Sequence, residues 1–179
     1  MFYVFFAEGF EEIEAIAVVD ILRRASIDVC TVGVGAKNVA GSHGMTVVCD
    51  KEINEINLIE GDSVVLPGGM PGTTNLYACD AVLNAVNFAK EKGNLVCAIC
   101  AAPLILGRLG ILDGKSGVCY PGFEDELKGC AVSADGVVVD GNVITGKGPG
   151  VAVDFALAIV EQVCSAETAA SLREGMQCR

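Results

Sequence analysis

Short apolar runs rich in β-branched and aromatic residues alternate with helix-length segments through the first half of the chain. The strands expected from this pattern are residues 2–7, 28–34, 62–66 and 94–99. Alternation of strand and helix indicates a parallel sheet, because parallel neighbours must be joined by a crossover that packs back onto the sheet. The sequence therefore predicts an α/β fold with a mostly parallel, doubly wound sheet and helices on both faces.

The remaining elements are expected from helix signals and from turn residues. A first helix is predicted at residues 11–26, with acids in its opening turn and arginines in its last, as the helix dipole favours. The other expected elements are hairpins at 36–50 and 137–144 and helices at 151–163 and 166–174. A length of 179 residues supports one core but not two ordinary domains, so a single domain over residues 1–179 is expected.

Charge and hydropathy exclude several classes of function. Twelve basic against 23 acidic residues give a net charge of −11, which disfavours binding to nucleic acid and to anionic membranes. The apolar run at residues 2–7 follows no basic stretch and is interrupted by Glu8, so it is neither a signal peptide nor a membrane span. A cytoplasmic location is the expectation.

The counts of nine cysteines and one histidine limit the redox and metal chemistry that this chain can carry out. A chain long enough to build a core needs no disulfide framework, so reduced thiols are expected, with Cys30, Cys49, Cys97 and Cys119 buried in apolar stretches. No second cysteine pair is present to complete four ligands, so a structural zinc site is not predicted. No cofactor is expected.

Residues 94–103 contain the most informative thiol, Cys100. A buried apolar strand runs into small residues and then Pro103, which suits the first turn of a helix. A thiol at such a corner faces helix N-terminal amides, which favour the thiolate and hence a nucleophile. An inert, packed cysteine is the competing interpretation. A dithiol pair of Cys97 and Cys100 is disfavoured, because strand residues three apart point to opposite faces.

Two other segments should reach the same edge of the sheet. Residues 62–69 form a strand ending in Pro-Gly-Gly, and Gly69 is a candidate amide donor to an oxyanion. Four acids follow the first strand: Glu8, Glu11, Glu12 and Glu14. One of them, turned inward, would have a raised pKa and carry protons. The residues alone do not identify which one.

Four motifs in order resemble the ThiJ/PfpI (DJ-one) superfamily, in the branch of the parkinsonism-associated protein deglycases and their bacterial relatives. The motifs are residues 8–14 (EGFEEIE), 65–69 (VLPGG), 98–103 (AICAAP), and 148–150 (GPG) leading into 154–160 (DFALAIV). The resemblance spans nearly the whole chain. It implies a flavodoxin-like three-layer sandwich and a homodimer.

The resemblance also implies roles for particular residues. Cys100 would be the nucleophile, and Glu14 the carboxylic acid hydrogen-bonded to its sulfur. The amides of Gly69 and Ala101 would form the oxyanion site, and Arg24 of the partner subunit would approach the pocket.

Gly68 and Tyr120 complete the predicted pocket, and Tyr120 departs from the family pattern. Many members have His-Pro where this chain has Tyr120-Pro121, so a Cys-His dyad is missing. A phenol ionises well above neutral pH and is a poor general base, and His43 lies in the predicted hairpin. Protease activity is therefore not expected.

Two functions from different classes use the same thiolate. The first is a cofactor-independent glyoxalase or deglycase, in which Cys100 attacks an α-oxoaldehyde or its early protein adduct and Glu14 moves the proton. The second is a redox-sensing stress protein in which Cys100 is oxidised to sulfinate and recognised by partners. A role in thiazole-phosphate metabolism, a name attached to some relatives, is not favoured, because nothing in this acidic chain indicates a phosphate pocket.

Overall fold

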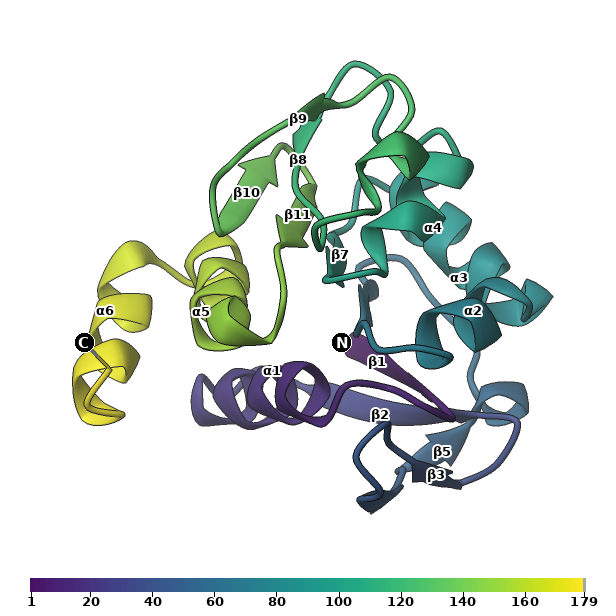
Figure 1. Ribbon diagram of the computed structural model, residues 1–179. Coiled ribbons are helices and arrows are strands. Elements are labelled where there is room, and N and C mark those ends of the chain that lie inside the picture. Colours follow the sequence, from purple (N-terminus) through teal and green to yellow (C-terminus); the bar gives the residue numbers. More distant parts are fainter. Residues whose placement is uncertain (179) are drawn as a thin grey trace.

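A seven-stranded sheet forms the centre of the protein, in a computed structural model that describes residues 1–178 (Figure 1). Its strands are β1 (Phe2–Ala7), β2 (Val29–Val34), β5 (Lys51–Glu52), β6 (Ser63–Leu66), β7 (Val96–Ile99), β10 (Val137–Asp140) and β11 (Val143–Gly146). The strand order is β10-β11-β7-β6-β1-β2-β5, and every neighbouring pair is parallel except β10 with β11. The mostly parallel sheet predicted from the strand–helix alternation is confirmed.

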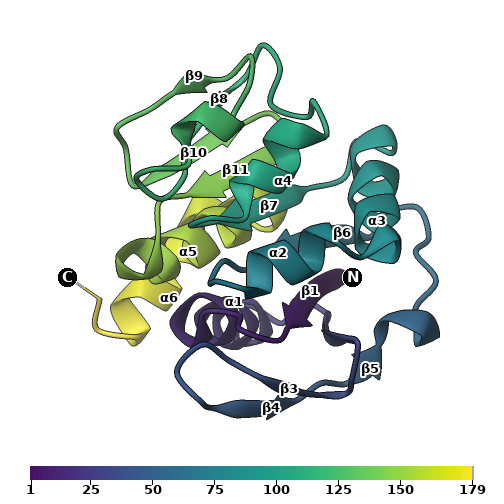
Figure 2. The same ribbon diagram turned by 45° about the vertical axis from the view of Figure 1, so that its right-hand side comes forward.

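Helices cover both faces of this sheet (Figures 1 and 2). One face carries α1 (Glu12–Arg24), α5 (Ala152–Val163) and α6 (Ala166–Gly175), and the other carries α2 (Gly72–Tyr77), α3 (Asp80–Glu91) and α4 (Pro103–Arg108). Short 3-10 turns are η1 (Ile53–Glu55), η2 (Glu124–Glu126) and η3 (Pro149–Val151). Within the described part of the chain, no helix has the length and apolar character to cross a membrane.

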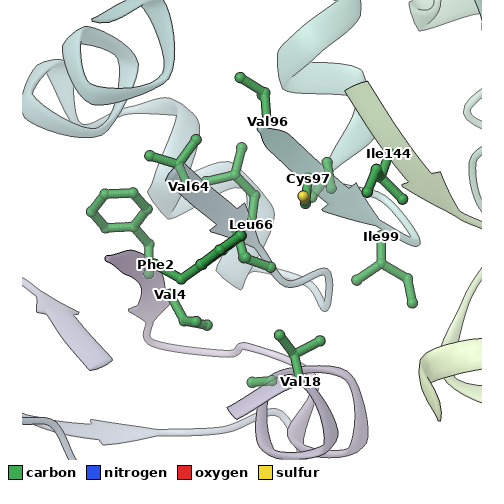
Figure 3. Close-up of a cluster of buried hydrophobic side chains, with 14 of the residues drawn as sticks. Phe2, Val4, Val18, Val64, Leu66, Val96, Cys97, Ile99 and Ile144 are labelled. Atoms are coloured by element: carbon green, nitrogen blue, oxygen red, sulfur yellow. The ribbon is translucent and has the colours of Figure 1, made fainter. Parts of the chain in front are cut away.

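The core lies between the sheet and its helices and is built largely from the central strands. Residues of β1, β6 and β7 are buried along their whole length, as expected for parallel strands covered on both faces. Figure 3 shows Val4 and Leu66 from neighbouring strands together with Val18 from α1. This packing fixes the carboxyl ends of β1, β6 and β7 relative to α1, and those ends carry the candidate site.

Both predicted hairpins are present. The first is β3 (Asn38–Ala40) with β4 (Thr46–Val48), and its turn packs on the segment between β1 and α1 through the bridge of Phe10 with Gly41. In the second, β10 and β11 are joined through Gly141, whose φ of 61° suits a tight turn.

The sequence pattern did not predict one small sheet, β8 (Ser116–Gly117) with β9 (Ala131–Val132), because two-residue strands carry no period. The strand expected from residue 94 begins at Val96. Asn94 instead uses its side-chain amide to donate to the Asp62 carbonyl oxygen at 2.8 Å.

Candidate active site

Cys100 stands at the sharp turn that follows β7. Its φ is 66°, a left-handed value that is costly for a residue with a side chain, and it is 9% exposed. Its backbone nitrogen donates to the Gly146 carbonyl oxygen at 2.8 Å, and its carbonyl oxygen accepts from the Tyr120 nitrogen at 2.8 Å. The strained conformation is therefore held from two neighbouring segments. The predicted place of Cys100 between strand and helix agrees with the structure, in which α4 begins at Pro103.

Glu14 lies beside this thiol on the inward face of α1. Its side chain is fully buried, and its Oε2 accepts from the Gly68 nitrogen at 2.8 Å. Its Oε1 is the oxygen without a hydrogen-bond partner in the described chain. A Cβ built on Gly68 would lie 2.5 Å from the Cys100 Cβ and 2.7 Å from Glu14 Oε2. The missing side chain at Gly68 is therefore what lets thiol and carboxyl meet.

Burial dominates the electrostatics of this pair. It raises the pKa of Glu14 to about 7, against the lowering effect of the Gly68 amide and of the contact with Cys100. Burial also raises the pKa of the Cys100 thiol, and an ionised Glu14 adds to that rise. The amides of Gly69 and Ala101 act in the opposite direction on the same sulfur. The pair thus holds one negative charge more easily than two.

Gly69 and Ala101 are the two backbone donors at the sulfur. Gly69 has a φ of 92°, and a side chain there would collide with the backbone between Gly9 and Glu11. Ala101 directly follows the nucleophile and is 2% exposed. Amides from two separate segments therefore act on the sulfur and lower the pKa of the thiol. Their use as an oxyanion site stays a prediction.

Tyr120 borders the site rather than entering it. It is 46% exposed, and with Pro121, Gly148, Pro149 and their neighbours it lines a cavity of about 290 Å³. Its ring covers Gly148, where a Cβ would come within 3.1 Å of it. The link from Tyr120 to Cys100 is the backbone hydrogen bond already described.

Arg24 is far from this site within its own chain. It lies ten residues after Glu14 on α1, a rise of about 15 Å, and pairs with Asp20 at 2.7 Å. Its approach to a pocket across a subunit interface stays a prediction.

The structure separates the four acids that the residues alone left undistinguished. Glu14 faces the thiol, Glu8 is exposed, and Glu11 and Glu12 face the β3–β4 turn. Helical periodicity supplies only part of the missing signal. Glu14 lies four residues before the fully buried Val18, but Glu11 lies four residues before the fully buried Ala15, so tertiary packing decides between them.

The other cysteines take packing positions. Cys30, Cys49, Cys97 and Cys119 are buried, as predicted, and all the cysteines are free within the described residues. Cys97 is fully buried within β7, and burial raises its pKa (Figure 3). Because Cys97 is buried in the core, it does not form an exposed dithiol pair with Cys100.

Fold and site together define a flavodoxin-like α/β protein with a cysteine presented at a strained turn after a central strand. The DJ-1/PfpI family matches residues 2–162, and the chain belongs to this family. The flavodoxin-like sandwich that the resemblance implied is confirmed by the superfamily neighbours.

Three relatives align with this chain over most of their own length. Protein DJ-1alpha of Drosophila melanogaster is 38% identical over 177 residues, covering 97% of this chain and 82% of that protein. The glutathione-independent glyoxalase DJR-1.2 of Caenorhabditis elegans is 34% identical over 92% of this chain and 89% of its own. A deglycase of Pyrococcus abyssi is 35% identical over 80% of this chain and 87% of its own.

Two plant relatives are longer, and solved structures confirm the fold. This chain spans only 38% and 43% of the DJ-1 homologs B and A of Arabidopsis thaliana, at 37% identity to each. Oxidized DJ-1 of Toxoplasma gondii superposes with a TM-score of 0.93 at 31% identity, covering 98% of this chain and 97% of that one.

Proposed function

We propose that this protein is a cofactor-independent glyoxalase or deglycase acting on α-oxoaldehydes or their early protein adducts. The observation that carries the proposal is the meeting of Cys100 with the buried carboxyl of Glu14 and with two backbone amides. Relatives named glyoxalase and deglycase support it.

The proton of the pair belongs on Glu14 in the reactive state. A thiolate at Cys100 accepts from the amides of Gly69 and Ala101, whereas a carboxylate at Glu14 accepts only from Gly68 and leaves Oε1 without a backbone donor. A protonated Glu14 removes the repulsion and donates to the sulfur.

The chemistry then balances without an external redox partner. The Cys100 sulfur adds to the aldehyde carbon, and the resulting oxyanion takes the Glu14 proton to give a hemithioacetal. The Glu14 carboxylate next removes the C–H proton of the hemithioacetal to give an enediolate, and returns that proton to the neighbouring carbon. The hemithioacetal hydroxyl proton passes to the neighbouring oxygen, which becomes the hydroxyl group and leaves a thioester at the former aldehyde carbon. Water cleaves the C–S bond, which releases the hydroxy acid and returns the thiol. The aldehyde carbon is oxidised and its neighbour reduced, so neither glutathione nor a redox cofactor takes part.

The test is methylglyoxal turnover by the wild type and Cys100→Ser, with hydroxy acid quantified as the product. Turnover should be lost in Cys100→Ser, because an alcohol in place of the thiol ionises far too weakly to attack. Cys164→Ser is the matched control, because Cys164 is exposed on the far end of α5 and should leave turnover unchanged. Equal turnover in wild type and Cys100→Ser would rule the proposal out.

The same donors favour a second candidate, redox sensing. A sulfinate at Cys100 would place oxygens against the Glu14 carboxyl and the amides of Gly69 and Ala101, which suit an anion. Two equivalents of peroxide supply the two oxygens and are reduced to water. A mass gain of two oxygens confined to Cys100, in a protein that does not consume methylglyoxal, would select this function.

A further inference from the structure

The only histidine of the chain lies in the turn between β3 and β4, against the start of α1. Its Nδ1 is 3.0 Å from Glu12 Oε2 and 3.4 Å from Glu11 Oε2. The Ser42 hydroxyl is 3.3 Å from Glu11 Oε2, 3.2 Å from Glu12 Oε2 and 3.1 Å from His43 Nδ1. We call the atoms Glu11 Oε2, Glu12 Oε2, Ser42 Oγ and His43 Nδ1 the turn cluster.

The turn cluster has more close contacts than protons to fill them. Its five contacts involve only two possible donors, the Ser42 hydroxyl and the imidazole Nδ1, and each of these carries at most one hydrogen. Both carboxylate oxygens can only accept when they are ionised. Two hydrogens can serve only two of the five contacts at a time, so the other three bring lone pairs together. A cation among these atoms would turn those three contacts from repulsive to favourable.

Charge leads to the same conclusion. The side chains of Glu11 and Glu12 are only 11% and 2% exposed, whereas the imidazole beside them is 67% exposed. Among the ion pairs of residues 1–178, neither acid has a lysine or arginine partner. Buried carboxylates are paired or bind metal. Backbone amides satisfy Glu12 Oε1, which leaves the Oε2 atoms of Glu11 and Glu12 to share one solvent-exposed imidazole and one hydroxyl.

The spacing of the donors fits a small divalent ion. Tetrahedral ligands at 2.0–2.1 Å from Zn²⁺ are separated from one another by about 3.3–3.4 Å. Five of the six separations run from 3.0 to 3.4 Å, and the ligand atoms of Glu11, Glu12 and His43 all lie within 4.8 Å of one another. Small movements of side-chain atoms would bring the donors to the tetrahedral distance. Imidazole with carboxylates suits zinc and its first-row neighbours more than Mg²⁺ or Ca²⁺, which prefer oxygen alone.

The other carboxylate oxygen of Glu12, Oε1, lies outside the turn cluster and holds the β3–β4 turn in place. Glu12 Oε1 accepts from the backbone nitrogens of His43 at 2.7 Å and of Met45 at 3.4 Å. Gly41 lies so close to this carboxylate that a side chain there would collide with it. The ligand Oε2 is therefore oriented by contacts made through the other oxygen, as in sites where outer contacts orient a ligand.

We propose that the turn cluster is a binding site for a first-row divalent cation, represented by Zn²⁺, with ligands from Glu11, Glu12, Ser42 and His43. The site lies outside the Cys100–Glu14 pair and does not depend on the function proposed for that pair. It joins the β3–β4 turn to α1 through the metal.

The test uses the lone histidine as a reporter. Zn²⁺ is added to Cys100→Ser protein, which excludes the reactive thiol as a ligand, while the single imidazole resonance is followed by NMR and affinity by calorimetry. One equivalent of Zn²⁺ should shift that resonance. His43→Ala and Glu11→Gln should each weaken binding at least tenfold. Glu12 is left intact, because its other oxygen holds the turn.

Matched variants keep the outcome clear. Glu8→Gln removes an exposed acid from the same connection and should bind as the parent does. Circular dichroism melts confirm that each variant is folded. An unshifted histidine resonance at saturating Zn²⁺, or equal affinity in the parent and His43→Ala, would overturn the proposal. A shift produced by Mg²⁺ but not by Zn²⁺ would overturn the assignment to a first-row ion.

Discussion

The Gly68 amide donates to Glu14 Oε2 at 2.8 Å, joining residues 54 apart in sequence. This bond connects the turn after β6 with α1 and fixes the carboxyl that faces Cys100. Because Oε2 is occupied, Oε1 is the oxygen available for proton exchange. In the proposed mechanism, Oε2 therefore positions the Glu14 side chain and Oε1 exchanges the proton.

Glu14→Gln separates those two roles. Glutamine keeps an oxygen for the Gly68 amide and an N–H for the sulfur, but it cannot transfer a proton. Turnover of methylglyoxal should fall by about 10²–10⁴, the usual contribution of a general acid or base. Glu8→Gln, at an exposed acid, is the control and should keep wild-type turnover. Unchanged kcat in Glu14→Gln would remove Glu14 from the mechanism.

Gly68→Ala should damage the site by crowding. The added methyl group would meet the Cys100 Cβ at 2.5 Å and Glu14 Oε2 at 2.7 Å. Overpacking of this kind costs about 1–3 kcal/mol of stability, and turnover should fall with it. Gly175→Ala is the control, because nothing lies near that position in α6 and alanine is the better helix former. Thermal melts and turnover of both variants test the prediction, which fails if Gly68→Ala behaves like Gly175→Ala.

Cys100 should be the most reactive of the nine cysteines towards iodoacetamide near neutral pH. Burial and an ionised Glu14 raise the pKa of this thiol, but the amides of Gly69 and Ala101 lower it, and a protonated Glu14 would remove the repulsion and donate to the thiolate. Cys97 is packed in the core. Peptide mapping after brief exposure at pH 6 measures the order of labelling. The exposed Cys164 gives the rate of an ordinary thiol. Labelling of Cys164 ahead of Cys100 would contradict the thiolate assignment.

The sheet and its hairpins were predictable because apolar runs and turn residues encode them locally. Residues 2–7 were predicted as a strand with the bounds that β1 has, since they form one uninterrupted apolar run. The short β8–β9 pair was not, because two residues carry no periodicity and its pairing depends on distant segments.

The site was predictable only in part. Cys100 stood out because small residues and a proline mark its turn. The choice of Glu14 came from resemblance, since four neighbouring acids look alike until the helix face is known. The turn cluster could not be predicted, because Glu11 and His43 are 32 positions apart and meet only when the β3–β4 turn packs on α1.

The exposed face of α1 should form a dimer interface, as the resemblance implies. Ile13 and Ile16 lie three residues apart and are 57% and 43% exposed, which favours burial against a second copy. Ile13→Lys should shift light scattering at micromolar concentration from dimer to monomer. Val132→Lys is the control, because Val132 is similarly exposed at 44% on β9, away from α1 (Figures 1 and 2). A wild type of only 18.5 kDa would contradict the prediction.

Tyr120→Phe tests whether the site needs a second side-chain acid or base. The phenol is exposed, and what joins residue 120 to Cys100 is a backbone hydrogen bond of 2.8 Å that phenylalanine keeps. The ring that covers Gly148 also stays. Loss of one neutral hydrogen bond to substrate costs about 0.5–1.5 kcal/mol, so turnover should fall by roughly tenfold at most.

Tyr120→Ala is the companion variant, because it removes the ring as well as the hydroxyl. If Tyr120 only shapes the pocket wall, this variant should raise KM while Tyr120→Phe keeps both constants near wild type. The reason is that the ring and Pro149 line the same cavity of about 290 Å³. A Tyr120→Phe protein as inactive as Cys100→Ser would show that the phenol is an essential acid or base, and the proton would then have to pass through Tyr120 rather than Glu14.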